Sequence, residues 1–378
     1  MDKLKSRFII IDYQIPYIKG LFENFCNVIY APANEFKAEI WWVKRHVPNA
    51  SIALIVRTRT LCNAELLRNS GVDFIATATI GTDHIDLEFC KENNITVFSA
   101  AGCNSGGVMQ FVFTALALAA KNNHLKLPIL ERVYNYMFSC SQKKQDITLG
   151  VIGVGNVGSK VVDFAQKLGW RIMANDPPKE HLHPEYCSLK ELLAVSDIVT
   201  LHLPLDPTTQ GFANKELFCG MKEGAIIINT SRGEVLDEVA LLDSLNLCKS
   251  ESESPRGKIG GYIVDVWQNE PNINLTLLDN ALVATPHIAG YSKEGKELGT
   301  QMVVRAVAQY LQIEELSDFV VNPSPSFNIL DLNKPIGEQL LSFFEISELD
   351  KKLRSAPKEF ETLRNEFSLR SEFRILND

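Results

Sequence analysis

The sequence predicts an α/β protein with two doubly wound parallel sheets and a small C-terminal α+β domain. Two series of short apolar runs, separated by helix-patterned segments, support this prediction, because strands covered on both faces are apolar almost throughout. The runs of the first series are FIIID (8–12), ENFCNVIYA (23–31), SIALIVRT (51–58), VDFIATATIG (72–81) and NITVFSA (94–100). Those of the second are ITLGVIG (147–153), WRIMAND (170–176), DIVTLHLP (197–204), GAIIINTS (224–231), GYIVDVW (261–267) and ALVATPHI (281–288). The rhythm stops after residue 300, where a charged, amphipathic tail indicates the third domain.

The composition agrees with a globular protein of two or three domains. The chain has 378 residues, of which 46% are hydrophobic and 22% charged, so a disordered chain or a disulfide-stapled miniature is excluded. The formal net charge of -8 argues against a broad nucleic-acid-binding surface. We therefore expect no nucleic-acid partner, and any anionic ligand must be held by local groups.

Signals for export, membrane insertion and metal binding are weak. The eight cysteines are dispersed without a C-x-x-C pair, which indicates a reducing compartment. The apolar run in MDKLKSRFIIID is too short for a signal peptide, and the uncharged stretch 99–120 opens with small and polar residues, as a buried helix does. His181, His183 and Cys187 lie in a proline-interrupted loop, so we expect no metal site. We expect a cytoplasmic protein without a membrane partner.

The glycine-rich segment GVIGVGNVGSK (150–160) is the strongest local signal. Gly153, Gly155 and Gly158 form G-x-G-x-x-G between a predicted strand and a predicted helix. In such a motif the first glycine allows a tight turn, the second lets a diphosphate approach the backbone, and the third lets helix and strand pack closely. Asp176 ends the next strand, where an acid binds the ribose of a dinucleotide, and two prolines follow it instead of an arginine. We therefore predict a Rossmann-like domain that binds NAD rather than NADP, although Lys179 is nearby.

Four further polar residues follow later strands of the second series. Arg232 lies in NTSRGEVLD, Asp265 and Glu270 in DVWQNEP, and His287 in TPHIAGY. Because the carboxyl ends of parallel strands meet at one edge of a sheet, we expect these residues to converge. An arginine there can bind a carboxylate through two hydrogen bonds, and a histidine beside a glutamate can exchange a proton near neutral pH. Taken singly, each has a simpler explanation, as a surface ion pair or a turn residue.

In this order and at these strand ends, the residues resemble the D-isomer-specific 2-hydroxyacid dehydrogenase superfamily over residues 8–310. Similarity to one branch, whose substrate is a phosphorylated 2-hydroxy acid, is carried by TATIGTDHID (77–86), SAAGCNSGG (99–107), NDPP (175–178), DVWQNEP (265–271) and HIAGYSKEGKELGTQ (287–301). The segments NPSPSFNI (322–329) and EFETLRNEFSLRSEF (359–373) resemble the extra C-terminal dimerisation domain of that branch. The resemblance implies an NAD-dependent dehydrogenase, a small phosphorylated 2-hydroxy acid as substrate, and a homodimer formed through the C-terminal domain.

The resemblance also implies roles for individual residues. Arg232 would bind the substrate carboxylate, His287 would exchange the proton of the C2 hydroxyl, and Glu270 would hydrogen-bond His287, which makes these three the catalytic residues. The implied cofactor contacts are Gly153, Gly155, Asn156, Val157, Gly158, Asp176, Leu203, Thr230, Ser231, Asp265 and Gly290. The implied substrate contacts are Arg57, Thr58, Thr79 and Tyr291, with Arg59 as an alternative to Arg57 beside the phosphate.

Three departures from the pattern accompany these roles. Gln110 replaces a common acid, Leu203 replaces a common threonine, and the polar stretch 249–258 is interpreted as an inserted surface loop. The expected domains are a discontinuous substrate-binding domain (1–103 and 289–312), an NAD-binding domain (104–288) and a C-terminal dimerisation domain (313–378). Two alternatives stay open: another 2-hydroxyacid dehydrogenase, such as a phosphoglycerate dehydrogenase, and a non-catalytic NAD-sensing protein with the same fold.

Overall fold

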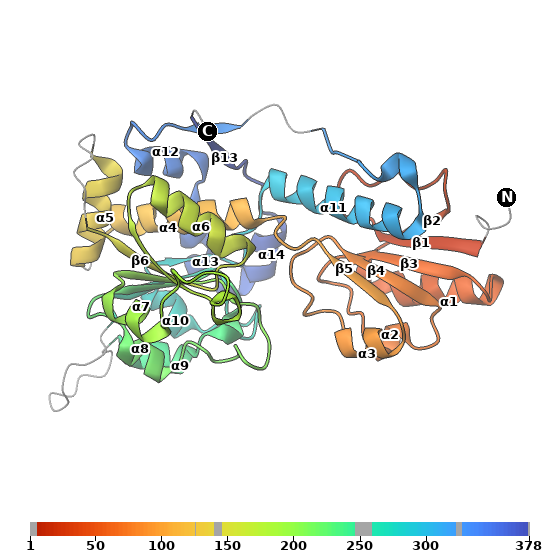
Figure 1. The fold of residues 1–378 in the computed structure, drawn as a ribbon, viewed down its shortest axis with the longest axis horizontal. Helices are drawn as coiled ribbons and strands as arrows, with labels where there is room; N and C mark the ends of the chain where they lie inside the picture. Colours follow the sequence, from red (N-terminus) through yellow and green to blue (C-terminus); the bar gives the residue numbers. More distant parts are fainter. Residues whose placement is uncertain (1–5, 125, 140–145, 246–258, 323–326, 377–378) are drawn as a thin grey trace. The chain divides into compact units, whose positions relative to one another are not determined.

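The computed structural model describes residues 6–124, 126–139, 146–245, 259–322 and 327–376, and the chain forms two compact units. Unit 1 comprises Met1–Asn104 and Lys293–Pro325, and unit 2 comprises Ser105–Ser292 and Ser326–Asp378 (Figure 1). The predicted loop at 249–258 lies outside the described residues. The chain therefore crosses between the units at residues 104, 292 and 325.

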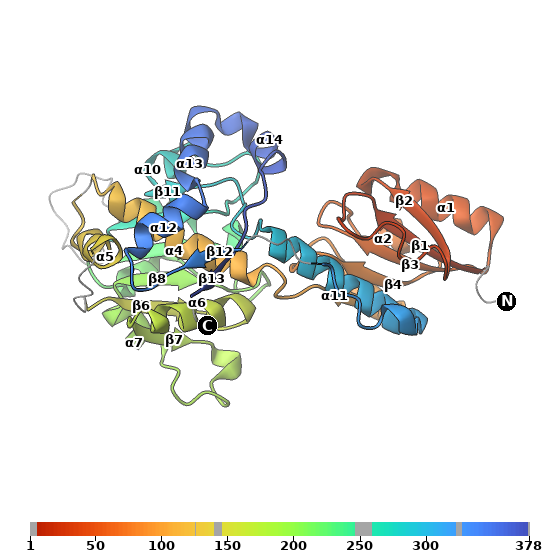
Figure 2. The same ribbon diagram turned by 90° about the horizontal axis from the view of Figure 1, so that it is seen from above.

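Unit 1 contains a five-stranded parallel sheet in the order β2-β1-β3-β4-β5. Its strands are β1 (Arg7–Asp12), β2 (Asn27–Ala31), β3 (Ser51–Val56), β4 (Val72–Thr77) and β5 (Thr96–Ser99). Its helices are α1 (Phe36–His46), α2 (Ala64–Leu67), α3 (Leu87–Glu92) and α11 (Lys293–Leu311). Along β1, Ile9 and Ile11 pack in the core that contains residues of α11, whereas Phe8 and Ile10 pack in the core that contains residues of α1. Figure 2 shows α11 lying over the strands of this sheet. This double coverage explains why the strands are apolar at successive positions.

Unit 2 contains a six-stranded parallel sheet in the order β11-β10-β9-β8-β6-β7. Its strands are β6 (Thr148–Ile152), β7 (Arg171–Asn175), β8 (Ile198–Leu201), β9 (Ile226–Asn229), β10 (Gly261–Val264) and β11 (Val283–Ala284). Its helices before residue 292 are α4 (Ser105–Lys121), α5 (Pro128–Phe138), α6 (Asn156–Lys167), α7 (Leu189–Val195), α8 (Lys215–Gly220), α9 (Glu238–Ser244) and α10 (Leu275–Asn280). The predicted α/β class with parallel sheets is confirmed, and every predicted apolar run contains a strand.

The residues that form these elements pack into two cores in unit 2, one on each face of the sheet. The core with α4, α5 and α6 contains Ile226 and Ile228, and the core with α7 to α10 contains Ile227 between them. Helix α4 is buried along nearly its whole length, as its uncharged sequence predicts, and it packs on α5, α6 and α12. Across the described residues, none of the helices is both long enough and apolar enough to pass through a membrane.

The C-terminal segment packs on both faces of this sheet. It consists of β12 (Asn328–Leu330), α12 (Ile336–Phe343), α13 (Ile346–Ser355), α14 (Phe360–Asn365) and β13 (Phe373–Ile375), and β12 pairs with β13 in parallel. Leu340 and Phe344 join the core of α4, α5 and α6, whereas Leu353 and Phe360 join the core of α7 to α10. The segment thus has the predicted α+β content and is continuous with unit 2, while its part in dimerisation stays a prediction.

Asp197, which precedes β8, ties three parts of unit 2 together through a buried carboxylate. It accepts hydrogen bonds from Arg132 at 2.7 Å, from Lys222 at 2.7 Å and from the backbone N–H of Thr148 at 2.9 Å. Burial acts to raise the pKa of Asp197, but these donors outweigh it and hold the pKa below its ordinary value. The side chain is 3% exposed, so the carboxylate depends on these donors in place of water.

We expect Asp197→Asn to lower the free energy of unfolding at pH 7 by about 1–3 kcal/mol, because two cations lose their buried partner. Since the folded-state pKa is depressed, the contribution is complete above the unfolded-state value of about 4 and is lost as the pH falls through the folded value. Urea unfolding of both proteins between pH 7 and pH 3 should show the difference shrinking below about pH 4. A difference that stays constant over this range would contradict the assigned role.

Candidate active site

The turn after β6 places three glycines in three different environments. Gly153 has φ +85°, and a Cβ there would lie 2.6 Å from the carbonyl oxygen of His202. A Cβ on Gly158 would lie 2.0 Å from the carbonyl oxygen of Gly153, so helix α6 can approach the turn only at a glycine. A Cβ on Gly155 would meet nothing within 4 Å. The tight turn, the open position and the close helix packing agree with the roles predicted from the motif.

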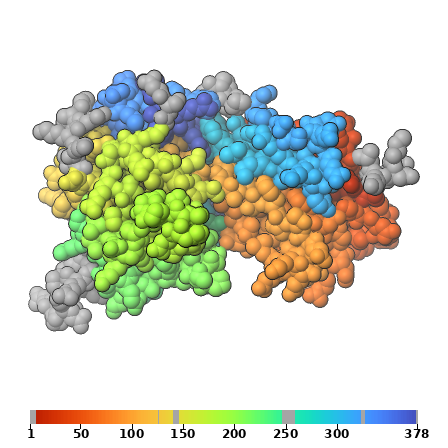
Figure 3. All heavy atoms as spheres, in the orientation of Figure 1, coloured from red at the N-terminus to blue at the C-terminus, as the bar shows by residue number. Residues whose placement is uncertain are grey.

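Asp176 follows β7 and contacts the same turn. Its Oδ2 accepts a hydrogen bond from the backbone N–H of Val154 at 2.8 Å, and Lys179 Nζ lies 3.7 Å from that oxygen. Lys179 also donates to the carbonyl of Val154, so its charge is held at the turn and beside the carboxylate. Leu203, two residues after β8, packs against the glycine turn, and its Cδ2 lies 3.1 Å from the position that a Cβ on Gly153 would occupy. The yellow-green segment after β7 lies at the surface of unit 2 in Figure 3.

The groups around this turn fit a dinucleotide. The N-terminus of α6 has no side-chain cap, so its first backbone N–H groups can serve a diphosphate beside the open position at Gly155. Thr230 Oγ1, just after β9, is buried and has no hydrogen-bond partner within the described parts of the chain. An orphaned hydroxyl at the carboxyl edge is the kind of group that a bound ligand satisfies. Asn156, Val157 and Asp176 lie at the same edge.

The loop after β9 carries Arg232 and is shaped by Asn229. Asn229 Oδ1 accepts from the backbone N–H of Ser231 at 3.0 Å and from its hydroxyl at 2.8 Å, while Nδ2 donates to the carbonyl of Arg232 at 2.9 Å. A Cβ on Gly233 would lie 2.0 Å from the carbonyl carbon of Trp267, so this loop rests directly on the loop after β10. The half-buried Arg232 is thereby held next to the segment that leads to Glu270.

Asp265 organises the loop that contains His287. The buried carboxylate accepts hydrogen bonds from Thr285 Oγ1 at 2.6 Å, from the N–H of Ile288 at 2.8 Å and from the N–H of Ala289 at 2.9 Å. Burial raises the pKa of Asp265, although His287 and the three donors act in the opposite direction. His287 itself has φ 56°, a left-handed conformation that costs about 1 kcal/mol for such a residue. The Asp265 contacts maintain this conformation, which turns the imidazole toward Glu270.

Glu270 and His287 form a direct pair. Nδ1 of His287 lies 2.8 Å from Oε2 and 3.1 Å from Oε1 of Glu270, and the backbone N–H of Trp267 donates to Oε1 at 3.0 Å. Burial acts to raise the pKa of Glu270, but His287, the Trp267 N–H and Arg364 together hold it below its ordinary value. The carboxylate therefore fixes Nδ1 as the ring nitrogen that faces it. Nε2 is the nitrogen left to exchange a proton.

The C-terminal segment supplies Arg370, which sequence reasoning missed, to the loop after His287. Its Nη1 donates to the carbonyls of Ile288 at 3.2 Å and Tyr291 at 3.0 Å, and its Nη2 donates to those of Ala289 and Gly107. This buried guanidinium therefore spans the loop that contains Gly290 and Tyr291. Gln110, the departure in α4, is also buried, and its Nε2 lies 3.5 Å from the carbonyl of Ser371.

In unit 1, the predicted phosphate-binding residues lie at the carboxyl edge of the sheet. Arg57 follows β3, and its Nε donates at 2.9 Å to the buried Asp12, which ends β1. Thr79 follows β4 and its hydroxyl lies 2.7 Å from that of Thr77, while Thr58 and Arg59 are exposed beside Arg57. Strands β1 and β3 are neighbours at the point where the strand order reverses, which is where doubly wound sheets bind ligands. Asp12 was not predicted, although an acid that ends a strand was visible in FIIID.

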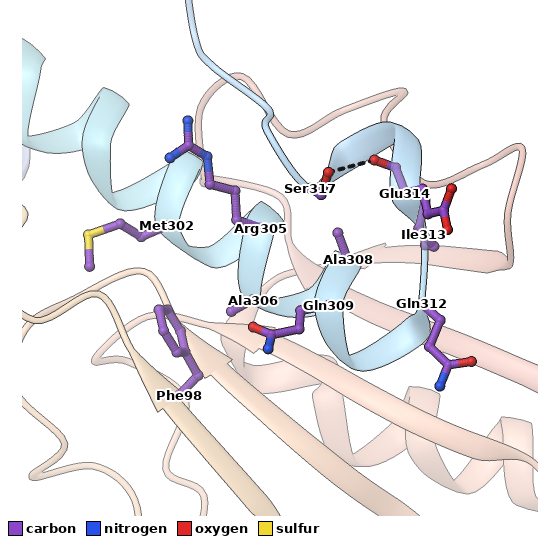
Figure 4. Close-up of a pocket in the computed structure, with 10 residues that line it drawn as sticks. All are labelled: Phe98, Met302, Arg305, Ala306, Ala308, Gln309, Gln312, Ile313, Glu314 and Ser317. Atoms are coloured by element: carbon purple, nitrogen blue, oxygen red, sulfur yellow. Dashed lines mark hydrogen bonds between the residues drawn. The ribbon is translucent and has the colours of Figure 1, made fainter.

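A separate hollow of about 460 Å³ lies in unit 1 between α11, β5 and the turn that follows α11 (Figure 4). Phe98 comes from β5, Met302, Arg305 and Gln309 come from α11, and Glu314 comes from the turn. None of the predicted substrate or cofactor residues lines it. It is therefore distinct from the edge that carries Arg57 and Thr79.

Comparison with known proteins assigns the class. Residues 115–289 match the family described as "D-isomer specific 2-hydroxyacid dehydrogenase, NAD binding domain". The crystal structure of a D-lactate dehydrogenase from Aquifex aeolicus, complexed with NAD and lactic acid, has a TM-score of 0.58 and 26% identity, over 84% of this chain and 100% of that one. Fold, glycine turn and histidine–glutamate pair thus define an NAD-dependent D-2-hydroxyacid dehydrogenase, and the predicted superfamily and cofactor are confirmed.

Curated relatives narrow the class further. An erythronate-4-phosphate dehydrogenase from Bacteroides fragilis is 39% identical over 371 residues, which cover 96% of this chain and 97% of the relative. One from Yersinia pestis is 33% identical over 97% of this chain and 93% of the relative. The chain belongs to the erythronate-4-phosphate dehydrogenase family. This is the branch to which the sequence motifs and the C-terminal segment are similar.

Two glycine substitutions should separate cofactor binding from folding. We expect Gly155→Ala to raise the Kd for NAD about tenfold with little change in Tm, because the added Cβ meets no protein atom but occupies space at the diphosphate position. Gly158→Ala should lower the free energy of unfolding by about 1–3 kcal/mol, because its Cβ would overlap the Gly153 carbonyl. Titration calorimetry and thermal unfolding measure the two effects. A Gly155→Ala protein that binds NAD normally would argue against this cofactor position.

Proposed function

We propose that this protein oxidises 4-phospho-D-erythronate with NAD⁺ to (R)-3-hydroxy-2-oxo-4-phosphooxybutanoate, a step of pyridoxal 5'-phosphate (vitamin B6) biosynthesis. The observation that carries the proposal is the Glu270–His287 pair, with Nδ1 and Oε2 2.8 Å apart, in a chain 39% identical to a named erythronate-4-phosphate dehydrogenase. The two sheet edges described above supply the remaining groups. We further propose a cytoplasmic homodimer, in keeping with the dispersed cysteines and the family-like C-terminal segment.

In the proposed reaction, residues of unit 2 carry out the proton transfer. NAD⁺ held at the glycine turn would supply the acceptor for the hydride that leaves C2 of the substrate. His287 Nε2 takes the proton of the C2 hydroxyl as the C2–O bond becomes a carbonyl, and Glu270 stabilises the resulting imidazolium. Arg232 binds the substrate carboxylate and orients C2, because a planar guanidinium matches a carboxylate through two hydrogen bonds.

The phosphate is assigned to residues of unit 1. Arg57, with its guanidinium held by Asp12, supplies a fixed positive charge, and the hydroxyls of Thr58 and Thr79 supply donors. Arg57 is favoured over Arg59 because an ion pair with a side chain that is 1% exposed orients it, whereas Arg59 is exposed. Tyr291 and the cofactor contacts Asn156, Val157, Leu203, Ser231, Asp265 and Gly290 complete the proposed assignments.

A substrate panel tests the function directly. NADH formation should be fastest with 4-phospho-D-erythronate and at least tenfold slower in kcat/KM with 3-phosphoglycerate, D-glycerate and D-lactate, because each lacks part of the carbon chain or the phosphate. Equal or faster turnover of any of the three would replace the proposed substrate. Absence of turnover with the whole panel, combined with tight NAD binding, would favour an NAD-sensing protein.

The catalytic assignments predict distinct kinetic defects. His287→Ala should lower kcat by about 10²–10⁴-fold with NAD affinity unchanged, because only proton transfer is lost. Arg232→Lys should be severely impaired in kcat/KM, because an ammonium cannot reproduce the planar contact with a carboxylate. Steady-state kinetics and NAD titration on the same samples measure both. Normal turnover after His287→Ala, or an unchanged kcat/KM after Arg232→Lys, would remove the corresponding residue from the mechanism.

A further inference from the structure

Arg364, in helix α14 of the C-terminal segment, contacts the histidine–glutamate pair. Its Nη1 lies 3.7 Å from Glu270 Oε2, and its Nε donates a hydrogen bond to the hydroxyl of Tyr291 at 3.2 Å. Glu270 Oε2 is the same oxygen that lies 2.8 Å from His287 Nδ1. One carboxylate oxygen thus contacts both an imidazole and a permanent cation.

The surroundings make this contact stronger than a surface ion pair. The side chains of Arg364 and Glu270 are 19% and 18% exposed, so water screens their interaction only in part. Burial acts to lower the pKa of Arg364, but Tyr291, Glu270 and Glu361 together raise it, so the guanidinium stays charged. Among the described residues, the buried Asp265 is a second acid that interacts with His287. Arg364 is the cation that acts directly on the Glu270 carboxylate.

The carboxylate of Glu270 is fixed at both ends. Oε1 accepts from the backbone N–H of Trp267 at 3.0 Å, and Oε2 lies between His287 and Arg364. The guanidinium adds a positive charge next to the carboxylate oxygen that lies nearest to the imidazole.

We propose that Arg364 is a positioning residue of the catalytic pair, which orients the Glu270 carboxylate toward His287 and limits how far that carboxylate favours the imidazolium form. This inference rests on the proposed use of His287 as the base that receives the substrate proton. In the oxidation the imidazole must be neutral before the reaction and protonated after it. An unopposed carboxylate would keep the ring protonated to higher pH and so withhold the base. A nearby guanidinium offsets this effect.

Three variants test the proposal in the full-length protein. Arg364→Gln removes the charge and keeps much of the side-chain length, and Arg364→Lys keeps the charge. Arg354→Gln is the matched control, because Arg354 is also a half-buried arginine of the C-terminal segment, paired with Asp350 at 2.9 Å and bonded to the Ala281 carbonyl at 2.8 Å. Two readouts apply to each: the pH profile of kcat/KM for oxidation, and the NMR titration of the His287 ring without ligand, assigned by comparison with His287→Gln.

Arg364→Gln should move both the acid limb of kcat/KM and the midpoint of the His287 titration upward by roughly 0.5–1 pH unit. Activity should therefore fall about two- to fivefold at the original midpoint and recover to within about threefold at high pH. Arg364→Lys should restore most of the wild-type profile. Arg354→Gln should lower Tm and leave both midpoints in place.

Several results would overturn the proposal. An unchanged or lowered midpoint in Arg364→Gln would show that the guanidinium does not oppose the carboxylate. A uniform loss of activity at all pH values, matched by Arg354→Gln, would show a structural role only. If Arg364→Gln does not fold, Arg364→Lys and Tyr291→Phe test the proposal in its place. Arg364→Lys must then keep the wild-type midpoint of the His287 titration. Tyr291→Phe must raise that midpoint, by less than the shift expected for Arg364→Gln.

Failure of the proposed substrate would be seen separately. If the wild-type protein oxidises a different 2-hydroxy acid of the panel, the pH profiles are measured with that acid, and the inference about Arg364 is tested unchanged. The ring titration needs neither substrate nor NAD. A wild-type protein that oxidises no 2-hydroxy acid would overturn the proposed function, while an upward shift of the titration would still support the contact of Arg364 with the pair.

Discussion

The buried carboxylate of Asp265 is the interaction on which the geometry of the active site depends. Asp265 directly follows β10, and its carboxylate accepts hydrogen bonds from the backbone N–H groups of Ile288 and Ala289. It therefore joins the end of β10 to the loop after β11. Each such charge-assisted hydrogen bond contributes about 1.5–3 kcal/mol, more than the conformational cost of holding His287 at positive φ. Without the Asp265 carboxylate, the N–H groups of Ile288 and Ala289 would lose their hydrogen-bond acceptor, and the imidazole of His287 would no longer be directed toward Glu270.

Two carboxylates near His287 therefore have different tasks because their environments differ. Asp265 is 1% exposed and is surrounded by neutral donors, and burial raises its pKa. Glu270 is 18% exposed and faces two cationic or potentially cationic groups, which hold its pKa low. The first carboxylate shapes the backbone, and the second, in the proposed mechanism, acts on the proton through His287. Separation of two acids by environment is a general way to give like residues unlike roles.

The sequence predicted features that depend on short-range spacing. The strands, the three-glycine turn with Asp176, and the strand ends that carry Arg232, Glu270 and His287 all lie where expected, because period and motif are local properties. It could not decide between Arg57 and Arg59, since β3 ends at Val56 and the alternation of side chains stops there. The proposed assignment favours Arg57 because it is paired with Asp12, a partner 45 residues away.

The contacts of the C-terminal segment could not be predicted for a related reason. Its amphipathic pattern indicates helices with one apolar face, but a pattern does not say which core receives that face. The structure divides the segment between both cores of unit 2, with Phe344 in one and Phe360 in the other. Only this division brings Arg364 to Glu270 and Arg370 to the carbonyls after His287.

The packing of the C-terminal segment connects it to the loops that carry the candidate catalytic residues. A domain that served dimerisation alone could be attached anywhere on the surface of unit 2 without contact to the catalytic loops. Instead, the guanidinium of Arg370 spans four backbone carbonyls, those of Gly107, Ile288, Ala289 and Tyr291, and that of Arg364 joins Tyr291 to Glu270. Any shift of α14 or β13 relative to the sheet must therefore move groups that hold the histidine loop.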